Sequence, residues 1–359
     1  MRVRYRLDGL LYDQMTIPRS HQAAVVSRIK IMARLNIAER RLPQDGRIGT
    51  THQGVEYDLR ISSMPSIFGE KVVIRVLEKT SMRMPFEQLG FMPEQKKLFE
   101  WMLNRPYGMV LVTGPTGSGK STTLYAALST INESTKNIIT IEDPVEYQLH
   151  GVTQTEVNKK IGVTFARGLR TMVRQDPDII MVGEIRDLET AEIAIQAALT
   201  GHLVFSTLHT NDAPGALVRL ANMGVEPFLI SSAVVGVVGQ RLVREICPNC
   251  KESYTPTEEV LAQIKNNGNR LPSDTQLVRG PGCLECNGIG YRGRSGVFEV
   301  MKVTDKIREL VLQRQSALAI RDQARKEGMR TMKESALEKA LKGTTSAEEI
   351  MRVICVEEE

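Results

Sequence analysis

A glycine-rich loop constrains the fold of this chain more than any other feature. Its residues are Gly114-Pro115-Thr116-Gly117-Ser118-Gly119-Lys120-Ser121, which fit the pattern G-x-x-x-x-G-K-[ST]. The loop lies between an apolar, strand-like run, 109–113, and a helix-compatible run, 122–131. Glycines in this context let backbone N–H groups surround phosphates at a helix N-terminus, while the lysine reaches the β- and γ-phosphates and the serine holds Mg²⁺. The sequence therefore predicts a nucleoside-triphosphate site formed by Gly114 to Thr122.

The residues around this loop are typical of an α/β domain with a mainly parallel sheet. Buried strands are predicted where short apolar runs alternate with helical stretches, at 109–113, 137–141, 178–182 and 203–207. The first 80 residues differ, because a helical run at 22–35 lies among strand-like runs at 3–7, 57–61 and 71–76. We expect a small α+β domain there, followed by a linker.

Acidic residues follow two of the predicted strands. Glu184 comes after the strand at 179–182, where an aspartate is more usual, and its extra methylene suggests contact with the metal ion through water. Glu142, Asp143 and Glu146 follow another strand and are three candidates for the base that orients the attacking water. Capping of a turn is an equally good use of Asp143, which precedes a proline.

Two of the five histidines, His202 and His209, flank the predicted strand at 203–207. A single histidine is usually structural. Two that bracket one strand of a nucleotide domain favour a role for one of them in sensing the γ-phosphate. His209 is taken as the candidate.

Four of the five cysteines form two C-x-x-C pairs. Cys247 and Cys250 are separated from Cys283 and Cys286 by 32 residues, 251–282. This spacing predicts a closed, tetrahedral Cys₄ zinc site with a structural role, because no position is left open for a substrate. A redox pair is the alternative and is less favoured. Cys355 is left over and is expected to be inert.

Charge and hydropathy limit the other possibilities. Residues 1–90 contain 15 Lys and Arg against 9 Asp and Glu, whereas the remainder is near neutral. Nucleic acid, nucleotide phosphates or solvent could each account for this basic excess. The longest strongly apolar stretch, 228–239, has about twelve residues, fewer than the roughly 20 needed to cross a bilayer. The N-terminus resembles no secretory signal, so a cytosolic location is expected.

Several longer motifs resemble those of the secretion ATPase superfamily. They are the P-loop at 114–122, the acidic box Thr140–Glu146, the run from Arg174 to Asp187, and the histidine box Thr200–Ala213. The segment Ile37–Arg47 and the Cys₄ insertion are similar to the branch that serves type II secretion and type IV pilus extension. This resemblance covers nearly the whole chain.

The resemblance implies a hexameric ring on the cytoplasmic face of the inner membrane that hydrolyses ATP, with Mg²⁺, to drive pilus or pseudopilus assembly. Its partners would be inner-membrane platform and cytoplasmic-neck proteins, through which it associates peripherally with the membrane. By motif position, Glu146 would be the base and Glu184 the metal-side acid. Arg47 and Arg60 of the small domain would close over the phosphates, where such arginines are worth about 10³ or more in rate.

The resemblance also gives the expected domain order. The predicted parts are a PAS-like α+β domain at 1–80, a linker at 81–93, a RecA-like ATPase core at 94–245, the zinc insertion at 246–287 and a helical C-terminal region at 288–359. Members of this branch usually carry an additional N-terminal docking domain, and the small domain is expected to start upstream of Met1. We therefore expect a shortened version of a longer protein.

Three alternatives remain at this point. A pilus retraction ATPase is less favoured because such enzymes generally lack the Cys₄ insertion. A nucleic-acid translocase is less favoured because the part from residue 91 onward is near neutral and has no basic, aromatic-rich stripe. A scaffold that binds ATP without hydrolysing it is opposed by the presence of Lys120, Ser121, Glu146 and Glu184. The sequence does not distinguish a secretion machine from a pilus machine.

Overall fold

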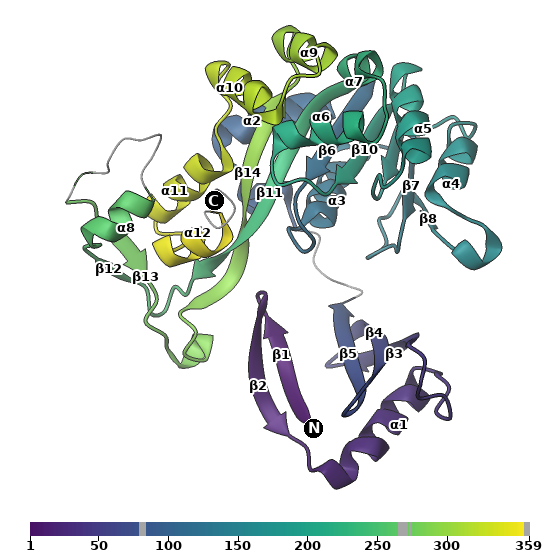
Figure 1. Cartoon of the computed structure of the whole chain (residues 1–359), viewed down its shortest axis with the longest axis vertical. Coiled ribbons are helices and arrows are strands. Elements are labelled where there is room, and N and C mark those ends of the chain that lie inside the picture. Colours follow the sequence, from purple (N-terminus) through teal and green to yellow (C-terminus); the bar gives the residue numbers. More distant parts are fainter. Residues whose placement is uncertain (79–83, 265–271, 273, 355–359) are drawn as a thin grey trace. The chain divides into compact units, whose positions relative to one another are not determined.

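The computed structural model describes residues 1–78, 84–264, 272 and 274–354 (Figure 1). Contacts divide the chain into two units, Met1–Arg83 with Glu146–Gln148, and Met84–Val145 with Leu149–Glu359. Part of the expected linker (81–83), the loop-like asparagines at 266–269, Cys355 and the acidic C-terminus lie outside the described residues. No helix within the described ranges is long and apolar enough to cross a membrane.

The first unit contains a two-stranded hairpin, one helix and a three-stranded antiparallel sheet. Strands β1 (Arg2–Leu7) and β2 (Leu10–Thr16) pair across an Asp8-Gly9 turn in which both residues have positive φ, as a tight hairpin requires. A short 3₁₀ helix, η1 (Arg19–His21), precedes α1 (Gln22–Met32). The sheet has the order β3-β4-β5, and its strands are β3 (Gln44–His52), β4 (Val55–Ser66) and β5 (Gly69–Glu78).

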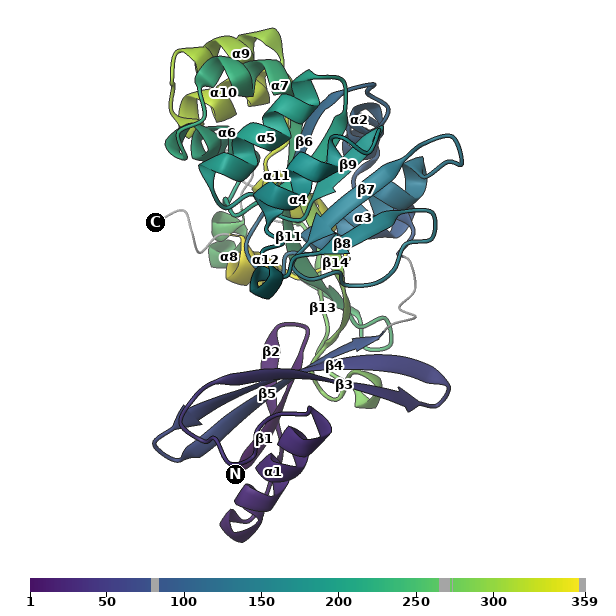
Figure 2. The ribbon, with the colours of Figure 1, turned by 90° about the vertical axis from the view of Figure 1, so that its right-hand side faces the viewer.

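The helix α1 lies against one face of the three-stranded sheet (Figure 2). Ile48 and Ile61 of the sheet are buried with Ala33, which follows the helix. Lys30 is also buried, and it pairs with Glu70 of β5. Because side chains alternate across a strand, the neighbours of these apolar residues, such as Arg47 and Arg60, belong to the opposite face.

The second unit is built on a seven-stranded sheet with the order β14-β11-β6-β10-β9-β7-β8. All of its neighbouring pairs are parallel except β11 with β14, which confirms the predicted α/β fold with a mainly parallel sheet. Its strands are β6 (Gly108–Thr113), β7 (Ile138–Glu142), β8 (Thr153–Glu156), β9 (Ile179–Val182), β10 (Leu203–Leu208), β11 (Val234–Ile246) and β14 (Tyr291–Lys302).

Helices cover this sheet and form the C-terminal part of the chain. They are α2 (Pro93–Leu103), α3 (Lys120–Ile131), α4 (Phe165–Met172), α5 (Leu188–Leu199), α6 (Ala213–Asn222), α7 (Pro227–Ala233), α9 (Asp305–Leu312), α10 (Ala317–Lys326), α11 (Met332–Leu341) and α12 (Ala347–Val353). Short 3₁₀ turns occur at η2 (Phe86–Leu89) and η3 (Lys159–Ile161).

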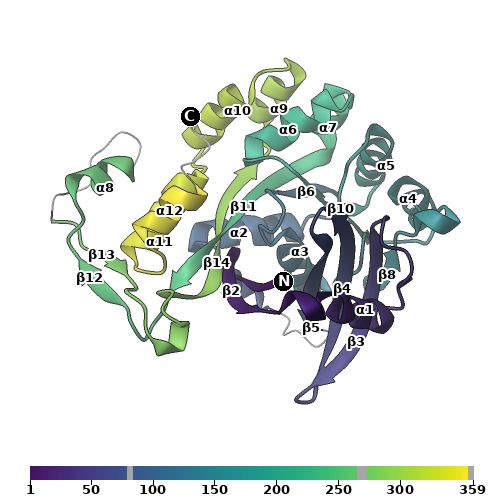
Figure 3. The same cartoon turned by 60° about the horizontal axis from the view of Figure 1, so that its bottom comes forward.

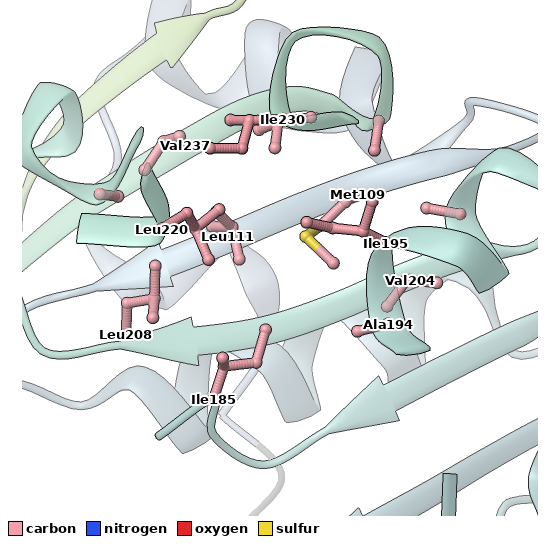
Figure 4. Packing of buried hydrophobic residues seen from close by; sticks show 14 of the residues in the cluster. Met109, Leu111, Ile185, Ala194, Ile195, Val204, Leu208, Leu220, Ile230 and Val237 are labelled. Carbon is pink, nitrogen blue, oxygen red and sulfur yellow. The ribbon is translucent and has the colours of Figure 1, made fainter. Parts of the chain in front are cut away.

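The strand β6, between β11 and β10, is buried along its whole length. Met109 and Leu111 face a cluster that includes Ile195 of α5, Leu220 of α6 and Ile230 of α7 (Figure 4). The alternate residues of β6 belong to the opposite face, and α3 contacts the same strand. Because both faces are covered, the end of β6 is a fixed point from which the glycine-rich loop begins.

The pair β11 and β14 forms one edge of the sheet and leads to the cysteine-containing insertion. Helices α11 and α12 pack on this pair, where Val243 and Val297 contact Ala336 and Ile350. The insertion contains β12 (Glu252–Tyr254), α8 (Glu258–Gln263), β13 (Leu277–Arg279) and η4 (Leu284–Cys286). Figure 3 shows α8, β12 and β13 at the far end of this strand pair, away from α4 and α5.

Candidate functional site

The glycine-rich loop adopts a backbone that other residues would strain. Gly114, Gly117 and Gly119 have φ angles of 151°, 82° and 87°, a region that L-residues with side chains avoid. A Cβ atom at Gly114 would lie 2.3 Å from the carbonyl oxygen of Gln240. The helix α3 begins directly after Gly119, so its free N–H groups lie at the loop as a phosphate site requires.

Two side chains of the loop fit a phosphate ligand. The Nζ atom of Lys120 donates to the carbonyl oxygens of Gly114 and Pro115, at 2.7 and 3.0 Å. Burial lowers the pKa of Lys120, and the charge of Glu184 opposes this shift. The Oγ atom of Ser118 is buried and has no hydrogen-bond partner among the described residues. Since buried polar atoms are nearly always paired, this hydroxyl suits an incoming phosphate oxygen.

Glu184 is held at the end of β9 by contacts with an arginine and a histidine. Its carboxylate lies 2.6 Å from Nη2 of Arg186 and 3.3 Å from Nε2 of His209. The hydrogen bond with Glu184 raises the pKa of Arg186. Thr207 donates from its hydroxyl to the carbonyl oxygen of Gly183 at 2.7 Å, which ties the ends of β9 and β10 together. An oxygen donor in this position is suited to a hard cation such as Mg²⁺.

The structure distinguishes the two histidines. β10 is parallel to β6 and places Leu208 opposite Thr113, so His209 follows β10 at the end where the glycine-rich loop follows β6. The backbone N–H of Thr210 donates to Thr113 Oγ1 at 2.9 Å. His202 precedes β10, and its Nδ1 atom lies 2.9 Å from the carbonyl oxygen of Ala197. His209 is therefore the histidine near the loop, and His202 closes the end of α5.

Glu142, one of the three candidate bases, is enclosed by hydrogen-bond donors. It is 4% exposed, and its carboxylate accepts from Thr140 Oγ1 at 2.6 Å, from Gln154 Nε2 at 3.2 Å and from the hydroxyl of Tyr125. A buried carboxylate with these donors is better suited to holding structure than to receiving a proton from water. Tyr125 and Gln154 carry no motif that could have identified them.

Arginines form a row across the sheet of the first unit. The register pairs Arg47 with Arg60 and Arg60 with Arg75, so the three belong to one face. Within the same unit, Arg60 Nη2 lies 3.3 Å from Oε2 of Glu146. Arg75 was not among the predicted site residues. Arg75 could have been predicted from the two glycine-containing hairpin turns, between β3 and β4 and between β4 and β5, because these turns set the register of the sheet.

The four cysteines of the insertion converge on one point. Their sulfur atoms lie within 4.8 Å of one another, with separations of 3.9 Å for Cys247–Cys283 and Cys250–Cys286 and 3.7 Å for Cys283–Cys286. Four sulfurs at the usual Zn–S distance of about 2.3 Å would be about 3.8 Å apart. This Cys₄ cluster therefore has the dimensions of a zinc site.

The backbone supports a thiolate at one of these cysteines. The N–H groups of Cys283 and Gly290 donate to Cys286 Sγ, both at 3.2 Å. Burial alone would raise the pKa of the Cys286 thiol, but these donors and the neighbouring thiols lower the pKa to about 6. Metal binding requires deprotonated cysteine, so this arrangement favours a metal ligand.

Comparisons with known proteins agree with these observations. The family model described as "Type II/IV secretion system protein" matches residues 1–352. Type II secretion system protein E of Pseudomonas aeruginosa is 51% identical over 98% of this chain and 69% of that protein. The type IV pilus assembly ATPase PilB of Thermus thermophilus is 50% identical over 98% of this chain and 39% of that protein.

Solved structures show the same fold. The pilus retraction motor PilT, crystallised with bound ADP, superposes with a TM-score of 0.64 at 27% identity, covering 97% of this chain and 89% of that one. The ATPase DotB of Legionella pneumophila gives a TM-score of 0.67 at 19% identity, covering 95% and 85% of the two chains.

Proposed function

Because the chain belongs to the type II/IV secretion system protein family, we propose that it is a Mg²⁺-dependent motor ATPase for pseudopilus or type IV pilus assembly. The observation that carries the proposal is the glycine-rich loop at the start of α3, with Lys120 and Glu184 beside it. Extension is favoured over retraction by the 50% identity with PilB, compared with 27% for PilT. The Cys₄ cluster supports the same branch.

The residues of the second unit would bind and orient the triphosphate. Lys120 would leave the two loop carbonyls, which it contacts in the structure, and pair with the β- and γ-phosphates. Ser121 and Glu184 offer oxygen atoms that would hold Mg²⁺, directly or through water. A bound Mg²⁺ would neutralise charge that develops between the transferred and leaving phosphates. His209, through its contact with Glu184, would respond to the γ-phosphate.

The residues of the first unit would complete the chemistry. Glu146 would accept the proton of the attacking water, and Arg47 and Arg60 would stabilise charge on the transferred phosphoryl group. This assignment is supported by the motif positions and by the pairing of Arg60 with Glu146.

The remaining assignments concern assembly. We take 94–245 as the ATPase core, 246–287 as a structural zinc insertion and the active form as a hexamer. Its location would be the cytoplasmic face of the inner membrane, reached through platform and neck proteins of a secretion or pilus machine. An active site completed between subunits would make turnover depend on assembly.

The test is Mg²⁺-ATP turnover per chain across a wide range of protein concentration, with sizing of the same samples. Turnover should rise and then saturate as oligomers form, and it should vanish when Mg²⁺ is chelated. Constant turnover from chains that size as monomers would contradict the assembled motor. Normal ATP binding with no turnover at any concentration would contradict the ATPase.

A further inference from the structure

A hydrogen bond joins the helix that follows the phosphate loop to the acidic box. Tyr125 lies on α3, five residues after Lys120, and its hydroxyl donates to Oε2 of Glu142 at the end of β7. Tyr125 is 1% exposed and Glu142 is 4% exposed. The two side chains are thus fixed to each other, and Glu142 is almost fully shielded from bulk water.

The other carboxylate oxygen of Glu142 leads through Gln154 to Leu149, three residues beyond the acidic box. Oε1 accepts from Gln154 Nε2 at 3.2 Å, and Oε1 of Gln154 accepts from the backbone N–H of Leu149 at 2.7 Å. Gln154 therefore bridges residues 142 and 149, which flank a six-residue segment, 143–148. The backbone at 142 is also fixed, because its carbonyl accepts from the N–H of Val157 at 2.8 Å.

We propose that Tyr125, Glu142 and Gln154 form a clasp that positions the segment 143–148 for hydrolysis. The inference rests on the proposed function, because it is Glu146, in the middle of this segment, that gives its position a role in turnover. Glu142 is then a positioning residue. A general base would be expected to have a carboxylate that is exposed or that accepts only one hydrogen bond. The clasp also connects α3, which carries the phosphate-binding N-terminus, with the segment that carries the proposed base.

The chemistry of the clasp allows a sharp choice of variants. Glu142→Gln keeps all three contacts, because its amide oxygen can accept from Thr140 and Gln154 while its NH₂ group donates to the Tyr125 hydroxyl. Glu142→Leu, Tyr125→Phe and Gln154→Leu each remove contacts while keeping a similar size. Tyr291→Phe is the matched control, because it deletes a part-buried hydroxyl that bonds Ser346 at 2.6 Å, outside the nucleotide site.

The experiment measures hydrogen exchange of the peptide that contains residues 143–149 without nucleotide, together with ATP affinity and steady-state kinetics. Tyr125→Phe, Gln154→Leu and Glu142→Leu should exchange about tenfold faster in this peptide, the scale set by one buried hydrogen bond. Their kcat should fall about tenfold or more, with ATP affinity and KM within about twofold of wild type. Glu142→Gln should recover most of the kcat lost in Glu142→Leu, and Tyr291→Phe should match wild type.

Two outcomes would overturn the proposal. One is wild-type exchange in the 143–149 peptide, or wild-type kcat, in both Tyr125→Phe and Gln154→Leu. The other is a Glu142→Gln variant as inactive as Glu142→Leu, which would make Glu142 a proton acceptor. Full turnover of Glu146→Gln, with the clasp variants still fast in exchange and slow in kcat, would refute the assigned base and leave the clasp standing.

Discussion

The imidazole Nε2 of His209 lies 3.3 Å from the carboxylate of Glu184. His209 directly follows the carboxyl end of β10, and Glu184 follows the carboxyl end of β9 after one glycine. In open parallel sheets, ligands bind at this edge. If Glu184 takes the metal-side role proposed above, this contact would let His209 respond when Glu184 engages the nucleotide.

His209→Ala should therefore reduce kcat while leaving ATP affinity within about twofold of wild type, since the histidine acts beside the acid and not on the phosphate loop. Turnover and calorimetric binding measure the two quantities. His202→Ala is the control, because its ring contacts the Ala197 carbonyl at the opposite end of β10, and its kcat should not change. Equal losses in both variants would assign the effect to folding.

Lys120→Ala should abolish tight ATP binding, because it removes the cation that lies over the phosphate loop. Titration of a fluorescent ATP analogue measures this loss. Lys136→Ala, which deletes a partly exposed lysine paired with Glu133, should bind as wild type does. Retained affinity in Lys120→Ala would place the triphosphate elsewhere.

Glu146→Gln should bind ATP and turn over about 10² to 10⁴ times more slowly, the usual contribution of a general base. Single-turnover hydrolysis separates this loss from any change in binding. Wild-type turnover would move the base to Asp143, since Glu142 is buried among hydrogen-bond donors.

Zinc should be present at one ion per chain, and Cys247→Ser or Cys286→Ser should release it. Metal analysis and thermal unfolding would show the loss, with the midpoint lowered before turnover is affected. Cys355→Ser is the control and should keep its zinc. Full thermal stability in a strong chelator would contradict a structural metal.

Glu299 should make stability depend on pH. Burial raises the pKa of this carboxyl to about 7, although it accepts from the N–H groups of Ala213 and Met332. The folded state then holds a proton that the unfolded state releases near pH 4.5. The contribution of Glu299 to the free energy of unfolding is fully present below that pH. It should fall by roughly 3 kcal/mol as the pH rises to about 7. Denaturant unfolding from pH 4.5 to 8 should show a smaller fall in Glu299→Gln.

Sequence patterns predicted those parts of the fold that depend on residues close together in the chain. The strands around the glycine-rich loop and the helix after it follow from short runs of sequence, and the Cys₄ cluster follows from two C-x-x-C pairs whose chemistry requires them to meet. The antiparallel strand β14 was not predicted, because its pairing with β11 joins residues such as Gly236 and Lys302. Tyr125 and Gln154 were missed for the same reason, since their partner Glu142 is 17 and 12 residues away. Register and long-range pairing decide such contacts, and neither has a local signature.

The cysteine cluster has a consequence for how the insertion can change in length. Cys247 follows β11 and Cys286 lies shortly before β14, so the sulfurs gather the neighbouring ends of two paired strands. Once the base of a loop is closed, lengthening it is inexpensive in entropy, about 0.6 kcal/mol for each doubling. The stretch 251–282 can therefore gain or lose residues during evolution while the register of β11 and β14, and the phosphate loop beside them, stays in place.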